Sequence, residues 1–260
     1  MTINLDLVLL VVAGLLLAIA VNGLADGWPT LWRSGRTRPC SSCGQPVAVF
    51  PWAGLHWLRQ RGRCAACGGR LPLRPSLIEL AMAMGLPLLW LADGWTARLG
   101  LDALYLAVGC LIVAIDVEHL RIPNAIVYPM ILIVIAAGAL GLGPRGADQA
   151  HGLVNALVGG AVALLVFAVF FLAGALFAAL LKAGTGPGLG MGDVKLATLV
   201  GLITGYPGVV QALVATLVSG ALAALLVIAW QIVQRRYKPG RALPYGPFLV
   251  LGTLWALLMS

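Results

Sequence analysis

The chain alternates long hydrophobic runs with shorter polar segments. We expect a helix in each of eight runs, which cover residues 5–25, 76–92, 99–116, 124–142, 153–181, 194–205, 208–233 and 243–259. A helix rises ~1.5 Å per residue and needs roughly 17–25 residues to cross a ~30 Å hydrocarbon core, so most of these runs are long enough. The 194–205 run is too short by itself and needs support from its flanks or from neighbouring helices. The pattern predicts an all-α polytopic membrane protein with about eight transmembrane helices.

Composition and charge also favour a membrane protein. Of the 260 residues, 61% are hydrophobic and only 10% are charged, with a mean hydropathy of +0.98, whereas about a quarter of a soluble domain is charged. With eight spans, all of the 17 lysines and arginines except Arg98 and Arg145 fall on one face of the membrane. The positive-inside rule makes that face cytoplasmic and places both termini outside. The net charge of +8 therefore indicates orientation and contact with the lipid bilayer. No recognisable module predicts nucleic-acid binding.

The segment 28–75 is the one polar stretch long enough for a small domain, and it separates a first transmembrane helix in 1–27 from a membrane bundle in 76–260. It holds two C-x2-C pairs, each followed by glycine, with the cysteines Cys40, Cys43, Cys64 and Cys67. Two facing knuckles supply four thiolates for a tetrahedral structural zinc ion. Two disulfides are the main alternative, which the reducing cytoplasm argues against, and a redox C-x-x-C lacks its usual βαβ surroundings. We expect a small cytoplasmic zinc-ribbon-like domain with four cysteine ligands, inserted after the first helix.

Two aspartates lie where hydrophobic runs meet polar flanks on the predicted cytoplasmic face. Asp116 ends the 99–116 run, and Asp193 follows Gly190-Met191-Gly192 at the end of a glycine-rich stretch that starts at residue 184. A carboxylate at a membrane segment is costly and indicates function, and glycines let another part of the backbone approach closely. The alternative for Asp193 is a flexible interhelical loop that ends in an aspartate of the first helical turn. Two neighbouring carboxylates share one proton, which is the chemistry of an aspartic protease.

Several segments, taken in order, resemble the type IV prepilin leader peptidases, a family of GxGD intramembrane aspartyl proteases. They are the two C-x2-C pairs, Pro75-Ser76-Leu77-Ile78-Glu79-Leu80, Ile115-Asp116 with Ile122-Pro123-Asn124, Gly190-Met191-Gly192-Asp193-Val194-Lys195-Leu196, and Pro244-Tyr245-Gly246-Pro247-Phe248. Together they cover most of the chain from Cys40 onward. The stretch from Val21 to Pro29 departs from the pattern and matches poorly what the family carries there.

The resemblance implies a multi-pass endopeptidase of the bacterial inner (cytoplasmic) membrane. Such enzymes remove the short basic leader peptide from type IV prepilins or pseudopilins, which serve pili and type II secretion, at the cytoplasmic membrane face. The resemblance further implies that Asp116 and Asp193 are the catalytic pair. It places Gly190, Gly192 and Lys195 in the active-site turn.

Methylation is a second activity that the resemblance implies. Many family members transfer a methyl group from S-adenosylmethionine to the new N-terminal residue after cleavage. Glu79, in a well-matched segment, is a candidate for that reaction or for supporting the active site, and its alternative is a capping role near the cytoplasmic end of a span. Methylation rests on the resemblance alone, because the sequence has no glycine fingerprint for a nucleotide cofactor.

Two other classes of function compete with a protease. A proton- or cation-coupled transporter would use carboxylates near the membrane midplane and would show an internal repeat, but we find no repeat. A noncatalytic scaffold with a zinc-knuckle domain would leave Asp116 and Asp193 at one face without a reason. Among the other polar residues, we expect Asp102 to be a solvated or interfacial group near the outer face. We expect Lys195 to extend toward the membrane interface.

Overall fold

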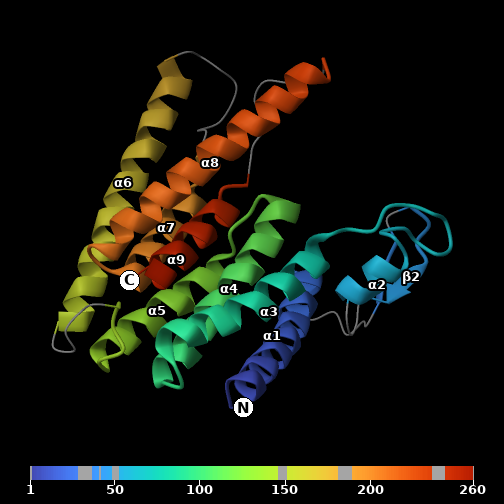
Figure 1. Ribbon diagram of the computed structural model, residues 1–260. Helices are drawn as coiled ribbons and strands as arrows, with labels where there is room; N and C mark the ends of the chain where they lie inside the picture. The colour runs from blue at the N-terminus through green and yellow to red at the C-terminus, as the bar shows by residue number, and fades with distance from the viewer. Residues whose placement is uncertain are drawn as a thin grey trace. The chain divides into compact units, whose positions relative to one another are not determined.

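The computed structural model describes residues 2–28, 37–40, 42–48, 53–145, 151–180, 189–235 and 244–259. In these ranges the elements (Figure 1) are α1 (Thr2–Gly27), β1 (Thr37–Pro39), β2 (Pro46–Ala48), α2 (Ala53–Arg59), α3 (Arg74–Asp93), α4 (Ala97–His119), α5 (Asn124–Ala139), α6 (Gly152–Leu180), α7 (Met191–Thr204), α8 (Gly208–Val233) and α9 (Gly246–Met259). A helix stands at each of the eight predicted runs, which confirms the helical membrane architecture. The strands and the short helix α2 all belong to the cysteine-containing segment.

Not every helix is long enough to cross a membrane by itself. Among the described residues, α1, α3, α4, α6 and α8 meet that requirement by length and composition, whereas α5 and α9 are shorter apolar helices. Helices α5, α7 and α9 have 16, 14 and 14 residues. At ~1.5 Å per residue they rise only about 21–24 Å, compared with a ~30 Å hydrocarbon core. These three helices therefore depend on contacts with their neighbours.

The chain divides into two compact units, Met1–Ile115 and Asp116–Ser260, with the boundary inside α4. In the first unit, α1 packs along α3 (Figure 1). The backbones touch: a Cβ atom on Gly14 would lie only 2.4 Å from the carbonyl oxygen of Met82. Position 14 therefore has no room for a side chain, and the two helices pack more closely than larger residues would allow.

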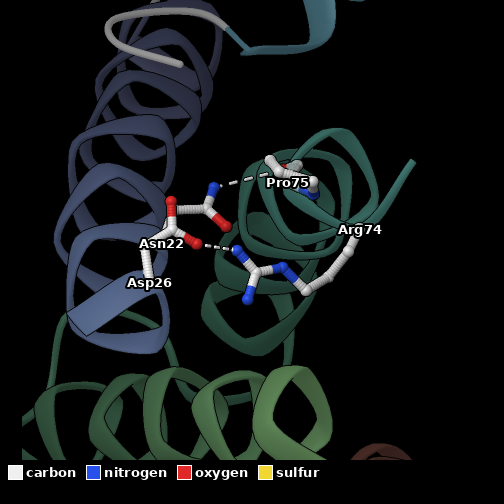
Figure 2. Close-up of polar contacts among 4 residues, drawn as sticks. All are labelled: Asn22, Asp26, Arg74 and Pro75. Carbon is white, nitrogen blue, oxygen red and sulfur yellow. Dashed lines mark hydrogen bonds and ion pairs between the residues drawn. The ribbon is translucent and has the colours of Figure 1, made fainter. Parts of the chain in front are cut away.

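Polar contacts join the end of α1 to the start of α3, as Figure 2 shows. The buried Asn22 side chain donates a hydrogen bond from Nδ2 to the carbonyl oxygen of Pro75 at 3.2 Å. The Arg74 guanidinium donates to the carboxylate of Asp26. These contacts hold together the two ends of the segment that carries the cysteines. They also give a structural role to part of the stretch that matches the family pattern poorly.

In the second unit, the short helix α7 lies against α5, α6, α8 and α9 (Figure 1). Its closest neighbour is α6: a Cβ atom on Gly159 or on Gly201 would lie 2.3 Å from the other residue's carbonyl oxygen. Beyond the end of α7, Asn155 holds the backbone of Tyr206 by two hydrogen bonds. Its Nδ2 donates to the carbonyl oxygen at 2.7 Å, and its Oδ1 accepts from the N–H at 2.9 Å. Direct backbone packing thus holds α7 in place, although this helix is too short to cross the membrane by itself.

Asp102 differs from its expected environment. Its side chain is fully buried, and its Oδ2 lies 3.7 Å from Nε of Arg98, one helical turn earlier in α4. The expectation of a solvated or interfacial group is therefore wrong. Residues four apart on a helix share a face, and a carboxylate loses less on burial when a cation accompanies it.

Candidate active site and metal centre

Asp116 lies in the last turn of α4 and is only 4% exposed. The helix ends just beyond it because Leu120 takes a left-handed φ of 51°, and the Leu120 N–H donates to the carbonyl oxygen of Asp116 at 2.8 Å. Pro123 then has an extended ψ of 119°, after which α5 begins. Proline suits this position because it fixes φ and has no N–H to satisfy. The aspartate is thus presented at a sharp turn between two membrane helices.

Asp193 lies in the first turn of α7 and is half-buried. Its Oδ2 accepts a hydrogen bond from the N–H of Gly190 at 2.9 Å, so the carboxylate caps the start of its own helix. Gly190 has ordinary extended dihedrals of −80° and 149°, but a Cβ atom there would lie 3.2 Å from that oxygen. Close approach, rather than unusual backbone geometry, favours glycine at this position. The earlier part of the glycine-rich stretch, residues 184–188, lies outside the described residues.

The first turn of α7 meets the turn after α4. A Cβ atom on Gly192 would lie 3.0 Å from the Cβ atom of Ile122, so these two segments are in backbone-to-side-chain contact. The contact places the first turn of α7, which carries Asp193, against the turn that follows Asp116, although the two acids are distant in sequence. The second unit therefore contains both aspartates, on two segments that are in contact.

Lys195 ties α7 to α5. Its Nζ donates to Oδ1 of Asn124 at 3.1 Å and lies 5.3 Å from the centroid of the Tyr128 ring. The ammonium group gains both a hydrogen bond and a cation–π contact. Lys195 therefore contacts the α5 segment that follows Asp116.

A third segment also reaches the site. The N–H of Gly246, the first residue of α9, donates to Oδ2 of Asp116 at 2.9 Å. The sequence shows Gly246 only as part of a family-like motif, and nothing in its local pattern indicates a partner in α4. The contact becomes visible only when the helices are packed.

The four cysteines lie on two similar turns in the first unit. The first turn joins the antiparallel strands β1 and β2, and the second lies between Arg63 and Arg70, which form an isolated antiparallel bridge. In each turn a glycine with positive φ, Gly44 (71°) or Gly68 (69°), donates its N–H to the carbonyl oxygen of the first cysteine of the pair, at 2.9 and 2.8 Å. These glycines supply the predicted tight turns, because the left-handed region costs glycine little.

The sulfur atoms of the cysteine cluster (Cys40, Cys43, Cys64 and Cys67) all lie within 4.8 Å of one another. The Sγ–Sγ distance is 3.7 Å between Cys40 and Cys67 and 4.0 Å between Cys43 and Cys64. With Zn–S bonds of ~2.3 Å, a regular tetrahedron has S–S edges of about 3.8 Å. A disulfide needs ~2.05 Å, and all four thiols are free. The cluster therefore fits a tetrahedral metal ion.

Neighbouring groups shift the pKa values of these thiols in opposite directions. The backbone N–H groups of Ser42 and Cys43 lower the pKa of Cys40 to about 6. The Gly69 N–H acts to lower the pKa of Cys67, but contacts with the other cysteines and burial outweigh it and raise that pKa to about 12. One thiolate therefore forms easily while a neighbouring thiol keeps its proton. A divalent cation would compensate the crowded negative charge and release that proton.

Glu79 accepts a hydrogen bond from the cysteine-containing segment. It is buried in α3, and its Oε2 accepts a hydrogen bond from the N–H of Gly54, the second residue of α2, at 2.7 Å. A carboxylate is favourable beside the first N–H groups of a helix. Glu79 therefore fastens α2 onto α3 within the first unit.

Comparison with known proteins identifies the family. Residues 103–228, which include both aspartates, match the type IV leader peptidase family. The prepilin leader peptidase/N-methyltransferase of Burkholderia pseudomallei is 31% identical over 235 residues, which cover 87% of this chain and 69% of that protein. Proteins of the same name from Stutzerimonas stutzeri and Bacillus subtilis are 28% and 27% identical, over 84% and 85% of this chain and 70% and 82% of theirs. No solved structure gives a significant match. The chain belongs to the type IV leader peptidase family and is a membrane peptidase.

Proposed function

We propose that this peptidase removes the short basic leader from type IV prepilins or pseudopilins at the cytoplasmic face of the bacterial inner membrane, with Asp116 and Asp193 as its catalytic pair. The observation that carries the proposal is the contact of Gly192 with Ile122, which joins the first turn of α7, where Asp193 lies, to the turn that follows Asp116. The names of the relatives, prepilin leader peptidases, support the substrate class.

The chemistry follows from a pair that holds one proton, because two neighbouring carboxylates ionise together only at high cost. The ionised carboxylate accepts a proton from water, and the water oxygen attacks the scissile carbonyl carbon. The other carboxyl group gives its proton to the carbonyl oxygen, which produces a tetrahedral diol. The first carboxyl group then protonates the leaving nitrogen as the C–N bond breaks. A diol hydroxyl returns a proton to the second carboxylate, so that the pair again holds one proton.

The distribution of basic residues supports the cytoplasmic orientation, because only Arg98 and Arg145 fall on the opposite face in an eight-span topology. In that orientation the first helix occupies 1–27, the cytoplasmic zinc-binding domain 28–75 and the protease bundle 76–260. Zinc held by the cysteine cluster would have a structural role. It would supply folding free energy to a loop too small to bury a large core.

Methylation extends the proposal. The relatives' names include N-methyltransferase, which supports transfer of a methyl group from S-adenosylmethionine to the N-terminus that cleavage creates. Glu79 is the candidate residue for this step. Cleavage and methylation change the mass of the substrate differently, so one mass spectrum separates them.

Asp116→Asn and Asp193→Asn test the catalytic pair by mass spectrometry of a co-expressed prepilin-like substrate. Each variant should reduce cleavage by at least ~10²-fold, because asparagine keeps the shape but cannot exchange the proton. The double variant should be little worse than either single one, since the pair acts as a unit. Glu118→Gln is the matched control, because Glu118 is an exposed acidic residue on the same helix as Asp116. Near-normal cleavage by either aspartate variant at wild-type protein levels would refute the proposal.

A further inference from the structure

We propose that the turn Pro244–Phe248, in which α9 begins, is a third component of the catalytic site, and that Gly246 is a positioning residue for Asp116. This inference rests on the proposed catalytic pair. The contact that carries it is the 2.9 Å hydrogen bond from the Gly246 N–H to Oδ2 of Asp116 in a buried environment. Asp116 is 4% exposed, so bulk water is poorly placed to replace this donor.

Glycine is needed at position 246 because the carboxylate occupies the space that a side chain would fill. A Cβ atom there would lie 2.8 Å from Oδ2 of Asp116 and 3.3 Å from both its Cβ and Cγ atoms. Any other residue would have to push the whole carboxylate group aside. Asp116 is packed on α4 and Gly246 begins α9, so the displaced carboxylate would lose the N–H that now holds it.

The hydrogen bond determines how Asp116 presents its two oxygens. An N–H donor favours the charged form of a carboxylate and makes the accepting oxygen a poorer place for a proton. Asp193 has the same arrangement, because its Oδ2 accepts the N–H of Gly190 at 2.9 Å. In both acids a glycine N–H at the start of a helix holds Oδ2, and the exchangeable proton is directed to Oδ1. The site is thereby organised before substrate arrives.

The position of the turn is set independently of Asp116. The Tyr245 ring packs edge-on against Phe167 of α6 and against Phe248, with centroid distances of 6.1 and 5.9 Å. Oγ1 of Thr216, on α8, donates to the carbonyl oxygen of Phe248 at 3.2 Å. Contacts with α6 and α8 therefore place the Gly246 N–H where Asp116 needs it.

Gly246→Ala, compared with Gly208→Ala, tests this role in the full-length membrane-inserted enzyme. Both glycines begin a helix, but a Cβ atom on Gly208 would meet only Cβ of Thr204 at an ordinary 3.5 Å. We measure kcat and KM against pH with a synthetic prepilin-like peptide, normalised to folded enzyme. Gly246→Ala should lower kcat by roughly 10²-fold with little change in KM, because a 1 Å displacement of a catalytic group has that effect. Gly208→Ala should keep normal activity.

The pH profile separates positioning from a structural defect. Losing the N–H destabilises the charged form of Asp116, so the acid limb of kcat should move to higher pH in Gly246→Ala. A kcat within about threefold of wild type, or a loss with an unmoved acid limb, overturns the inference, since a positioning effect near 10²-fold is expected. If Asp116→Asn is inactive while Gly246→Ala is normal, only this inference fails. If Asp116→Asn remains active, the proposed catalytic pair fails with it.

Discussion

Gly159→Ala tests how α7, a helix too short to cross the membrane alone, is held in place. A Cβ atom at position 159 would lie 2.3 Å from the carbonyl oxygen of Gly201 and 2.7 Å from Cα of Gly205. These are backbone atoms, so no rotamer change can relieve the contact. Ordinary contact begins near 3.4 Å, and the α6 and α7 backbones must therefore separate by about 1 Å.

Both stability and activity should respond to this separation. Overpacking of a close-packed site costs about 1–3 kcal/mol. At roughly 2–4 °C per kcal/mol for a chain of 150–250 residues, this cost lowers Tm by about 2–12 °C. Helix α7 carries Asp193, so the same shift would displace a proposed catalytic carboxylate and lower the cleavage rate by about 10²-fold.

Thermal unfolding of the purified protein in detergent and cleavage of a prepilin-like peptide measure the two effects. Gly23→Ala is the control, because a Cβ atom on Gly23, in α1, would meet nothing within 4 Å. Alanine is the better helix former, so this control should be neutral or slightly stabilised. A Gly159→Ala protein with unchanged Tm and unchanged cleavage would show that backbone contact with α6 does not position α7.

Three further predictions concern the rest of the molecule. The protein should bind about one zinc ion per chain at the cysteine cluster, with an affinity that falls as pH falls because the thiols must lose protons. Metal analysis of protein prepared without chelator checks this prediction, and an absence of zinc would contradict it. Glu79→Ala leaves the Gly54 N–H without its acceptor and should weaken the attachment of α2 to α3 by about 1–3 kcal/mol, whereas Glu79→Gln keeps an acceptor. Limited proteolysis compares the two variants, and equal protection of α2 in both would refute the role of the contact. Reporters in 28–75 and at residue 238 should both be cytoplasmic, and an external signal at 238 would show that the predicted number of spans is wrong.

The sequence by itself determined the features that depend on local pattern. Long apolar runs form helices because a chain in a membrane must satisfy its backbone hydrogen bonds within each segment. The two cysteines of each pair lie together because each C-x2-C turn, closed by Gly44 or Gly68, is a local structure that presents two sulfurs on one side. The resemblance to known peptidases likewise depends on short ordered motifs, and the family comparison confirms it.

Only the tertiary structure decided which distant groups touch. The packing of Gly192 on Ile122 joins the segments that carry the two aspartates, and the docking of α9 supplies the Gly246 N–H to Asp116. Packing also buries Asp102, whose sequence position suggested a solvated group. Residue periodicity reports which face of a helix is apolar. Close approaches such as these depend on how neighbouring helices fit at the scale of single atoms, which one segment's pattern does not encode.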